Sequence, residues 1–582
     1  MSYSGINSLR GIAAYHFIPL PIPQTKRRKN IFLTRIEDNG TQLLIYHKFC
    51  KVGHSHLHLS AYRYSAARCS KQEMPACIIS EQVLEQENQL GIVWTAAEIA
   101  EAIGGQVVKL APPGSICTDT RTIKAGQWFL ALAGPSFDGH DFLQSALAKG
   151  CAGVVGNRVF EGWPRGFVKV EGNNTLIALQ KLGFSARKKF KGPVVGITGS
   201  VGKTTTRAMI ALALESLGQI HQTSGNQNNH IGVPLTLISM SFSSKACVLE
   251  LGMNHVGEIR ELARISEPCV RVVLNVGPAH MENFRSLEEV GRAKGEILLE
   301  ARPGDICVLN ADDPLVAALP IPNGVQRVLF GSKSGCDVRL IAAKSIQGGC
   351  AIQVTLEHCS SSSIGLEKDS LQCEKSMPES RVLEGDAYSK KSNSRVVFEI
   401  ASPGLHLGMN ACAAAAVAVS LGVSLTQVGK SLSNFSPINM RLNMETFENG
   451  ITIINDVYNA NPMSMVAALK LLRSVECKGR KVALLGDMLE LGIPSKNAHL
   501  DILKMCQEIG VELLAVAGLH FIEAIKVLQL ESSELSIVSA PNSELLASQI
   551  REKLHIGDIV LVKGSRGMQM EIVVDVIKEI NI

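Results

Sequence analysis

Residues 196–204, Gly-Ile-Thr-Gly-Ser-Val-Gly-Lys-Thr, constrain the fold of this chain more than any other stretch. An apolar run at 193–198 predicts a buried strand here, and a helix is predicted from Arg207 to Leu217. A strand, a glycine-rich turn and a helix in this order form a cradle for phosphate. Glycine lets backbone N–H groups approach an anion, and the helix N-terminus adds partial positive charge. Lys203 adds a full charge, and the Thr204 hydroxyl can ligate Mg²⁺.

The match to the strict phosphate-loop pattern is incomplete, because Ile197 occupies the position of its first glycine. An ordinary strand–turn–helix with a glycine-rich turn is the alternative. The Gly-Lys-Thr sequence stands directly at the start of the helix, which favours a nucleoside triphosphate as ligand. The residues expected to surround its phosphates are Gly199, Ser200, Val201, Gly202, Lys203, Thr204 and Thr205.

A carboxylate lies in the next predicted strand, 246–251, where Glu250 is surrounded by apolar residues. Burying a carboxylate is costly unless it is paired or binds a metal. Beside a phosphate loop, Mg²⁺ is the natural partner, and a structural salt bridge is the competing interpretation. The preceding loop, 223–234, is rich in asparagine and glycine and predicts a ligand-facing loop, although any one of these residues could belong to a solvated turn.

A lysine is predicted on the apolar face of a helix that a capping box, Ser286 to Glu289, begins. Lys294 shares its stripe with Leu287, Val290, Ile297 and Leu298. A buried ammonium is strongly disfavoured, so Lys294 must pair, lose its proton, be chemically converted, or extend its amine to solvent.

Polar runs follow several predicted strands. The C-terminal part alternates strands and helices, which predicts a parallel sheet with helices on both faces. Ligands bind at the carboxyl edge of such sheets. The polar runs at these strand ends are 310–313 in the central part, and 456–462, 486–490 and 563–566 in the C-terminal part.

Composition shifts suggest four segments. Residues 1–88 are predicted to be a largely disordered transit segment and linker, 89–190 a small α/β domain, 191–437 the nucleotide-binding domain and 438–582 the C-terminal α/β domain. Residues 357–394 are polar and predict a disordered insert between two strands of a hairpin. In the small domain, the loop from Thr118 to Arg121 could hold a ligand.

Charge is unevenly distributed. Residues 1–72 carry eleven basic and two acidic residues, a net charge of +9, which leaves −4 for the remainder of a chain of net charge +5. This composition resembles an organelle transit segment. The basic run at 26–29 could instead be a nuclear signal or a nucleic-acid patch, and a plain disordered tail is a third interpretation. The mildly acidic body gives no broad case for nucleic-acid binding, and no apolar run is long enough for a membrane span.

Together these stretches resemble the Mur ligases, from about residue 92 to the C-terminus outside the insert. The motifs that carry the resemblance lie at 198–204, 224–234 (Ser-Gly-Asn-Gln-Asn-Asn-His-Ile-Gly-Val-Pro), 250–255 (Glu-Leu-Gly-Met-Asn-His), 456–461 (Asp-Val-Tyr-Asn-Ala-Asn), 486–492 (Gly-Asp-Met-Leu-Glu-Leu-Gly) and 563–566 (Lys-Gly-Ser-Arg). The resemblance implies an α/β fold with three domains: an N-terminal domain for a UDP-linked substrate, a central P-loop ATPase and a Rossmann-like C-terminal domain.

The resemblance also implies roles for individual residues. Lys203 would hold the β- and γ-phosphates of ATP, Thr204 and Glu250 one Mg²⁺, and His280 a second Mg²⁺. Lys294 matches a position that CO₂ carbamylates in the family, which would turn a buried cation into a metal ligand. Lys203, His280 and Lys294 are therefore the expected catalytic residues.

Contacts to the substrates are implied in the same way. Asn310 and Asp456 would contact the adenosine part of the nucleotide, and Arg441 its phosphates. The other expected substrate-binding residues are Thr118, Asp119, Thr120 and Arg121 on the uridine side, and Asn226, Asn228, Asn229, Asn459 and Lys563. Two positions depart from the family pattern. Arg441 follows Met440 where glycine is usual, and Leu407 follows His406 where asparagine is usual.

The best match within the family is the member that uses ATP to join D-Ala-D-Ala to a UDP-N-acetylmuramoyl tripeptide through an acyl phosphate, in peptidoglycan synthesis. A monomeric enzyme in the plastid stroma is expected, with the mitochondrion as the less favoured organelle. The alternative is a catalytically impaired nucleotide-binding scaffold with the same fold in an organellar complex, and a third interpretation is a ligase with another acceptor.

Overall fold

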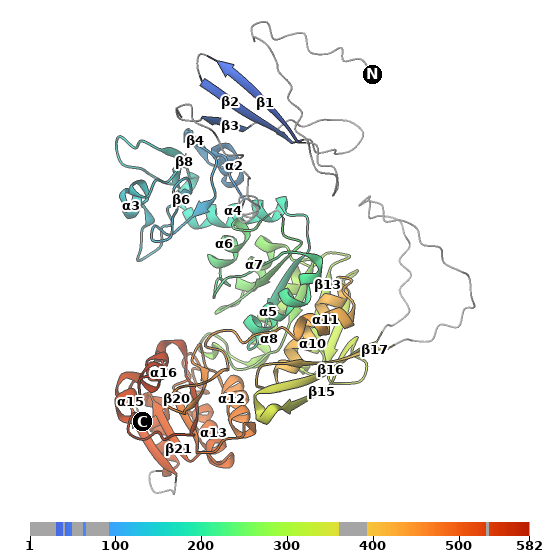
Figure 1. Ribbon diagram of the computed structural model, residues 1–582, viewed down its shortest axis with the longest axis vertical. Coiled ribbons are helices and arrows are strands. Elements are labelled where there is room, and N and C mark those ends of the chain that lie inside the picture. Colours follow the sequence, from blue (N-terminus) through green and yellow to red (C-terminus); the bar gives the residue numbers. More distant parts are fainter. Residues whose placement is uncertain are drawn as a thin grey trace, which may run out of the picture. The chain divides into compact units, whose positions relative to one another are not determined.

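The computed structural model describes residues 92–241, 243–359, 393–530 and 535–580, and the backbone of three strands nearer the N-terminus (Figure 1). These three strands form an antiparallel sheet within a compact unit that ends at Val83: β1 (Ile31–Asp38), β2 (Thr41–Lys48) and β3 (Tyr62–Ser65). They lie in the segment for which the sequence predicts no element. The Asn-Gly dipeptide between the first two strands is a strong hairpin signal that the sequence interpretation did not use. The transit role of this segment stays a prediction.

The second compact unit, Leu84–Ile582, begins with a small domain around a five-stranded sheet of order β4-β8-β7-β6-β5. The β4–β8 pair is antiparallel and the other pairs are parallel. Thr95 and Glu98 form a capping box at the start of the first helix of this domain, and Gly104 (φ 69°) ends that helix. The elements are β4 (Gln106–Lys109), β5 (Ile116–Cys117), β6 (Trp128–Leu130), β7 (Gly153–Gly156), β8 (Gly166–Lys169), α2 (Ala96–Ile103), α3 (Leu143–Ala148) and α4 (Thr175–Lys189).

The central domain is built on a nine-stranded sheet of order β10-β11-β9-β12-β13-β14-β15-β16-β17. The strands from β10 to β15 pair in parallel, and β16 and β17 complete an antiparallel edge. Their bounds are β9 (Val194–Thr198), β10 (Ile220–Gln222), β11 (Ala246–Glu250), β12 (Val270–Val273), β13 (Ile306–Asn310), β14 (Gln326–Gly331), β15 (Val338–Ile346), β16 (Ala351–His358) and β17 (Ser394–Ile400).

Helices cover both faces of this sheet, because successive residues of β9 point to opposite sides. Val195 packs in one core with α5, α10 and α11, whereas Val194 packs in another with α6, α7 and α8. Figure 1 shows α10 and α11 beside the strands at the antiparallel edge. The helices are α5 (Lys203–Ala213), α6 (Gly232–Ile238), α7 (Glu258–Ser266), α8 (Leu287–Leu299), α9 (Pro314–Ala317), α10 (Leu407–Ser420) and α11 (Leu425–Leu432).

Several predicted elements of this domain are confirmed with shifted ends. Helix α5 begins at Lys203, four residues before the predicted start, because Gly202 in the left-handed region (φ 83°) begins it. The capping box predicted for α8 is half wrong: Ser286 Oγ accepts the N–H of Glu289, but the Glu289 carboxylate accepts the N–H of Arg285 instead. The predicted hairpin is confirmed as β16 and β17. The insert predicted at 357–394 includes strand residues at both ends, Glu357 and His358 in β16 and Ser394 in β17, and its residues 360–392 lie outside the described residues.

The alanine-rich run in α10 is a packed helix. Residues 411–418 are all buried, and α10 packs closely on α5. Alanine side chains let two helices approach each other, so this run brings α10 close to the phosphate loop. Within the described ranges, no helix is both long and apolar enough to cross a bilayer.

The C-terminal domain has a six-stranded sheet of order β18-β19-β23-β20-β21-β22. The parallel arrangement that the sequence predicts is confirmed for five strands, and β18, which the sequence interpretation missed, pairs antiparallel to β19. Helices α12, α13 and α14 pack on one face, and α15 and α16 on the other. The elements are β18 (Asn443–Thr446), β19 (Thr452–Asp456), β20 (Lys481–Gly486), β21 (Leu513–Ala517), β22 (Ser536–Ala540), β23 (Ile559–Lys563), α12 (Pro462–Ser474), α13 (Ser495–Glu508), α14 (Leu519–Val527), α15 (Ser543–Ile550) and α16 (Glu571–Lys578).

Candidate functional site

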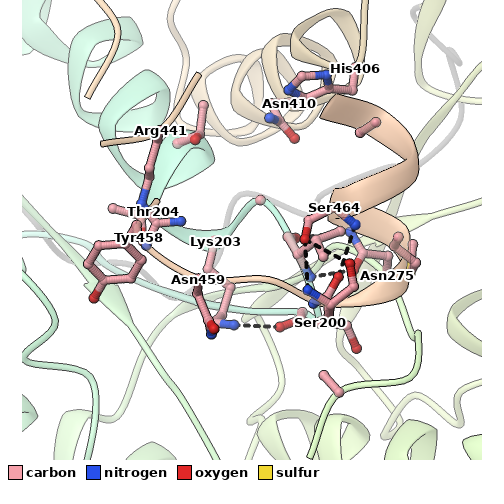
Figure 2. A pocket seen from close by; sticks show the side chains of 18 of the residues that line it. Ser200, Lys203, Thr204, Asn275, His406, Asn410, Arg441, Tyr458, Asn459 and Ser464 are labelled. Atoms are coloured by element: carbon pink, nitrogen blue, oxygen red, sulfur yellow. Dashed lines mark hydrogen bonds between the residues drawn. The ribbon is translucent and has the colours of Figure 1, made fainter. Parts of the chain in front are cut away.

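A cavity of about 490 Å³ lies where the carboxyl edges of the central and C-terminal sheets meet (Figure 2). Residues from both domains line it, and most of the predicted site residues are among them. The predicted residues at this cavity are Gly199, Ser200, Val201, Gly202, Lys203, Thr204, Thr205, Asn226, Asn228, Glu250, His280, Lys294, Arg441, Asp456, Asn459 and Lys563.

A lysine hydrogen bond and a glycine conformation define the shape of the phosphate loop. Lys203 is the first residue of α5, and its Nζ donates a hydrogen bond to the Gly199 carbonyl oxygen at 2.8 Å. The left-handed φ of Gly202 favours glycine, and a Cβ atom there would lie 2.9 Å from Asn410 Oδ1, so the Asn410 side chain would have to shift. Burial lowers the pKa of Lys203, and nearby Arg441 lowers it further while Glu250 opposes the shift. An anion beside this ammonium would favour its charged form.

Glu250 is buried at the end of β11 and binds two neighbours without an ion pair. It is 3% exposed; Thr204 Oγ1 donates to its Oε2, and Asn228 Nδ2 donates to its Oε1, both at 2.9 Å. No lysine, arginine or histidine of the described residues forms an ion pair with it. The salt-bridge alternative is therefore wrong for the described part of the chain. A carboxylate bridged to a phosphate-loop threonine fits a cation site.

Lys294 lies 3% exposed on α8, at the edge of the same cavity. Within the described residues it has neither a hydrogen-bond partner nor an ion-pair partner. Burial lowers the pKa of its amine well below the usual value, and the positive charge of Lys203 lowers it further. The sequence left several alternatives open for Lys294. Pairing with a carboxylate does not occur among the described residues, and the burial of the amine favours loss of its proton or chemical conversion.

His280 follows β12 and lines the cavity in a left-handed backbone conformation, with φ 55°. Its Nδ1 lies 2.6 Å from Oε2 of Glu490, in the C-terminal domain. Burial lowers the pKa of His280, and Lys203 and Lys294 act in the same direction against the opposing effect of Glu490.

Two residues join the His280 loop to the phosphate loop: Ser200, which the sequence predicts at the phosphates, and Asn275, which the sequence interpretation missed. Asn275 accepts from the N–H of Val201 at 2.9 Å and donates to the Val201 carbonyl oxygen at 3.1 Å. Ser200 Oγ donates to the carbonyl oxygen of Gly277 and accepts from its N–H, both at 2.9 Å. Figure 2 labels Ser200 and Asn275 on one side of the cavity. A polar residue directly after an apolar strand was the one local signal for Asn275.

The C-terminal domain supplies the opposite wall. Asp456 and Lys563 stand in register at the ends of β19 and β23, and Lys563 Nζ donates to Asp456 Oδ2 at 2.6 Å and to the Asn459 carbonyl oxygen at 2.7 Å. Lys563 is 1% exposed, so this pair is a buried link between two strand ends. Asn459 lines the cavity, and its side-chain Oδ1 accepts the N–H of Ala460 at 2.8 Å.

Arg441 lies at the start of the C-terminal domain, and its guanidinium carbon is 4.0 Å from the centre of the Tyr458 ring (Figure 2). A guanidinium over an aromatic ring is held by cation–π attraction. Met440 and Leu442, on either side, both adopt left-handed φ angles, 63° and 52°. This explains why a glycine before the arginine would suit the position. His406 and Asn410, near the start of α10, also line the cavity although Leu407 departs from the family pattern.

Some predicted residues lie elsewhere. Asn310 does not line the cavity: its Nδ2 donates to the Leu274 carbonyl oxygen at 2.8 Å and its Oδ1 accepts the N–H of Asp312 at 2.9 Å. Asn229 lines a neighbouring cavity of about 160 Å³. The predicted uridine-side loop, Thr118 to Arg121, follows β5 in the small domain, away from the lining of either cavity, and there Arg121 pairs with Asp119 at 2.7 Å. Their roles stay predictions.

The donor set at the cavity suits a cation that arrives with phosphate. Among the described residues, no group of three or more histidine, cysteine, aspartate or glutamate side chains gathers to hold a metal. Thr204, Glu250 and His280 offer few protein ligands, which is how Mg²⁺ is commonly bound together with substrate phosphates. The residues present therefore fit a nucleotide-bound magnesium.

Comparison with known proteins agrees with this geometry. Residues 197–418 match the family model of the Mur ligase middle domain, and residues 440–566 match that of the Mur ligase glutamate ligase domain. The UDP-N-acetylmuramoyl-tripeptide–D-alanyl-D-alanine ligase of Bacillus subtilis is 32% identical over 489 residues, 82% of this chain and 97% of the relative. The chain belongs to the Mur ligase family.

Further members support the assignment. The ligase of the same name from Synechocystis is 30% identical and covers 79% of this chain and 91% of its own. Among solved structures, MurF from Acinetobacter baumannii has a TM-score of 0.70 at 28% identity, over 84% of this chain and 99% of that one. MurF from Thermotoga maritima, in complex with ADP, has a TM-score of 0.64 at 26% identity, over 80% and 97%. The predicted three-domain Mur ligase architecture is confirmed, and the chain is an ATP-dependent ligase that forms amide bonds.

The left-handed backbone at Met440 leads to a testable prediction. A β-branched side chain clashes in this conformation, whereas asparagine tolerates it. Met440→Val should therefore lower the free energy of unfolding by about 1 kcal/mol more than Met440→Asn. Urea unfolding of the full chain measures the difference. Asn439→Val is the matched control, because it compares asparagine with valine at the exposed residue next to Met440, where φ is not positive. An equal cost at both positions would contradict the strain at Met440.

Proposed function

We propose that this Mur ligase joins D-Ala-D-Ala to a UDP-N-acetylmuramoyl tripeptide at the expense of ATP, acting as a monomer. The substrates are those in the names of the relatives from Bacillus subtilis and Synechocystis, which align over most of this chain. The observation that carries the proposal is the convergence of Lys203, Glu250, His280, Lys294 and Arg441 on one cavity between two domains.

The reaction has two steps in this proposal. A carboxylate oxygen of the tripeptide attacks the γ-phosphorus of ATP, and ADP leaves. The amine of D-Ala-D-Ala then attacks the carbonyl carbon of the acyl phosphate, the new amide bond forms, and inorganic phosphate leaves as the nitrogen loses a proton to solvent. Both steps bring anions together, so positive charge must offset their repulsion. Lys203 binds the β- and γ-phosphates, and Arg441, held by Tyr458, approaches the same phosphates from the other domain.

Magnesium would be held in two places. Thr204 and Glu250 would hold one ion, and His280 with a modified Lys294 a second. The ions would neutralise phosphate charge. The walls of the cavity come from two domains, so docking of the C-terminal domain excludes water from an acyl phosphate that hydrolyses easily.

Carbamylation of Lys294 by CO₂ is part of the proposal. The amine is buried, has no partner among the described residues and has a strongly lowered pKa, so its neutral, nucleophilic form is accessible. The amine nitrogen attacks CO₂, a C–N bond forms, and one proton is released. The resulting carbamate is an anion beside Lys203 and His280, where the unmodified amine would add another positive charge.

We further propose that the basic N-terminal segment directs the chain to the plastid stroma. The net charge of +9 within residues 1–72 supports this proposal. Residues 1–88 fused to a fluorescent protein should accumulate in plastids of plant cells. Accumulation in mitochondria or in the nucleus would contradict the plastid assignment.

The proposed activity predicts a strict acceptor dependence. The full chain, incubated with ATP, Mg²⁺ and UDP-N-acetylmuramoyl tripeptide, should release phosphate when D-Ala-D-Ala is added, and mass spectrometry should show the UDP-linked pentapeptide. L-Ala-L-Ala is the matched control and should give no product. Binding of ATP without turnover would instead favour the nucleotide-binding scaffold, and turnover with another acceptor would favour a ligase of different specificity.

The proposed carbamate predicts the behaviour of Lys294 variants. Lys294→Ala should lower turnover by about 100-fold or more, because losing a metal ligand costs at least the upper end of the 10- to 100-fold loss that removing its supporting partner produces, and short carboxylic acids should restore part of it. Lys430→Ala, an exposed lysine on α11, is the matched control and should leave turnover unchanged. With ¹³C-bicarbonate, NMR should show a carbamate signal in the wild type that Lys294→Ala lacks. Full activity of Lys294→Ala would contradict the carbamate.

A further inference from the structure

A short contact joins the nucleotide-binding cavity to a loop of the C-terminal domain. His280 Nδ1 and Glu490 Oε2 are 2.6 Å apart. His280 belongs to the loop after β12 of the central sheet, and Glu490 to the loop after β20 of the C-terminal sheet. An ionised carboxylate can only accept, so Nδ1 must carry the hydrogen in this bond.

The other ring nitrogen of His280 is the one available to a ligand. Within the described part of the chain, Nε2 has no hydrogen-bond partner, while the imidazole lines the cavity together with Lys203 and Lys294. A neutral imidazole with its hydrogen on Nδ1 has its lone pair on Nε2. The contact with Glu490 therefore selects the tautomer that can donate a lone pair to a cation.

Both ends of the contact are fixed by backbone hydrogen bonds. On one side, Ser200 and Asn275 join the His280 loop to the phosphate loop, as described above. On the other side, three successive N–H groups before Glu490 are bonded. They are Asp487 N–H to the Ala517 carbonyl oxygen at 3.0 Å, Met488 N–H to His499 Nε2 at 3.0 Å, and Leu489 N–H to Ser565 Oγ at 2.9 Å.

The backbone of both partners is strained. His280 has φ 55° and Glu490 has φ 63°, and a residue other than glycine adopts this left-handed conformation at a cost in free energy. A functional need for the side-chain directions of these two residues would explain why both retain a strained backbone at the boundary between the domains.

We propose that Glu490 is a positioning residue that holds the His280 imidazole with its hydrogen on Nδ1 and its Nε2 free to ligate the nucleotide-bound cation. This inference rests on the proposed role of His280 as a metal ligand. Since Glu490 belongs to the C-terminal domain, the ligand is set when the two domains are docked, so that closure of the cavity and completion of the cation site are one event.

The tautomer of His280 is the direct test. In the full chain with ¹⁵N-labelled imidazoles, the His280 signals are identified by their loss in His280→Gln. We expect the Nδ1–H tautomer in the wild type and a mixture of tautomers in Glu490→Ala. Glu490→Gln should keep the Nδ1–H tautomer, because its amide oxygen accepts the same hydrogen. Glu508→Ala, an exposed glutamate of α13, is the matched control and should not change these signals.

Cation binding gives a second readout that does not need turnover. With ADP bound, Mn²⁺ affinity measured by electron paramagnetic resonance should fall 10- to 100-fold in Glu490→Ala, the usual effect of losing the group that orients a metal ligand. It should fall less in Glu490→Gln. In a His280→Ala background, Glu490→Ala should add no further loss, because Glu490 acts through His280.

An Nε2–H tautomer in the wild type would overturn the proposal, and this result does not require any variant to fold. An equal loss of Mn²⁺ affinity from Glu490→Ala with and without His280 would also overturn it. Neither measurement uses the tripeptide or D-Ala-D-Ala, so both remain decisive if the ligase assay shows no acceptor-dependent turnover.

Discussion

Excess positive charge at one cavity is the constraint on which the rest of the structure depends. Lys203, Lys294 and Arg441 all line it, whereas the carboxylate of Asp456 is already paired with Lys563. Glu250 is a carboxylate at this cavity without an ion-pair partner among the described residues. Burial disfavours the charged forms of its neighbours Lys203 and Lys294. Such an arrangement is stable in the presence of anions, and the phosphates of ATP and the carboxylate of a substrate provide them. The positive charges that repel one another across this cavity are those that stabilise the reacting state.

The two sheets put these groups in place by a common rule. In parallel strands the carboxyl ends fall on one edge, so short polar runs at strand ends gather there even when they are far apart in sequence. The Asp456–Lys563 pair joins residues 107 positions apart, and the His280–Glu490 pair joins residues 210 apart. Both sheets are required for the site, because residues from the edges of both sheets line the cavity.

Residues whose chemistry conflicts with their local pattern could be predicted from sequence. Glu250 is a carboxylate in an apolar strand, and Lys294 is an amine on an apolar helix face. Both were predicted as site residues for this reason, and both lie at the cavity. The phosphate loop had a local signature as well. In contrast, Asn275 was not predicted. The partners that Asn275, Ser200 and Glu490 bind lie 74 to 210 residues away along the chain, and no local pattern could indicate these pairings. Strands β14, β15 and β18 were missed because their sequences lack a clear alternation.

The backbone around Arg441 is restrained at the point where the chain enters the C-terminal domain. Met440 and Leu442 both occupy a narrow left-handed region, the Arg441 N–H bonds to the Ile438 carbonyl oxygen at 3.0 Å, and the Met440 carbonyl oxygen accepts the Tyr458 N–H at 3.2 Å. A connection restrained in this way is a stiff joint with few accessible torsions. If the C-terminal domain rotated onto a bound nucleotide about this joint, little conformational entropy would be lost, and the guanidinium would return to the same place each time.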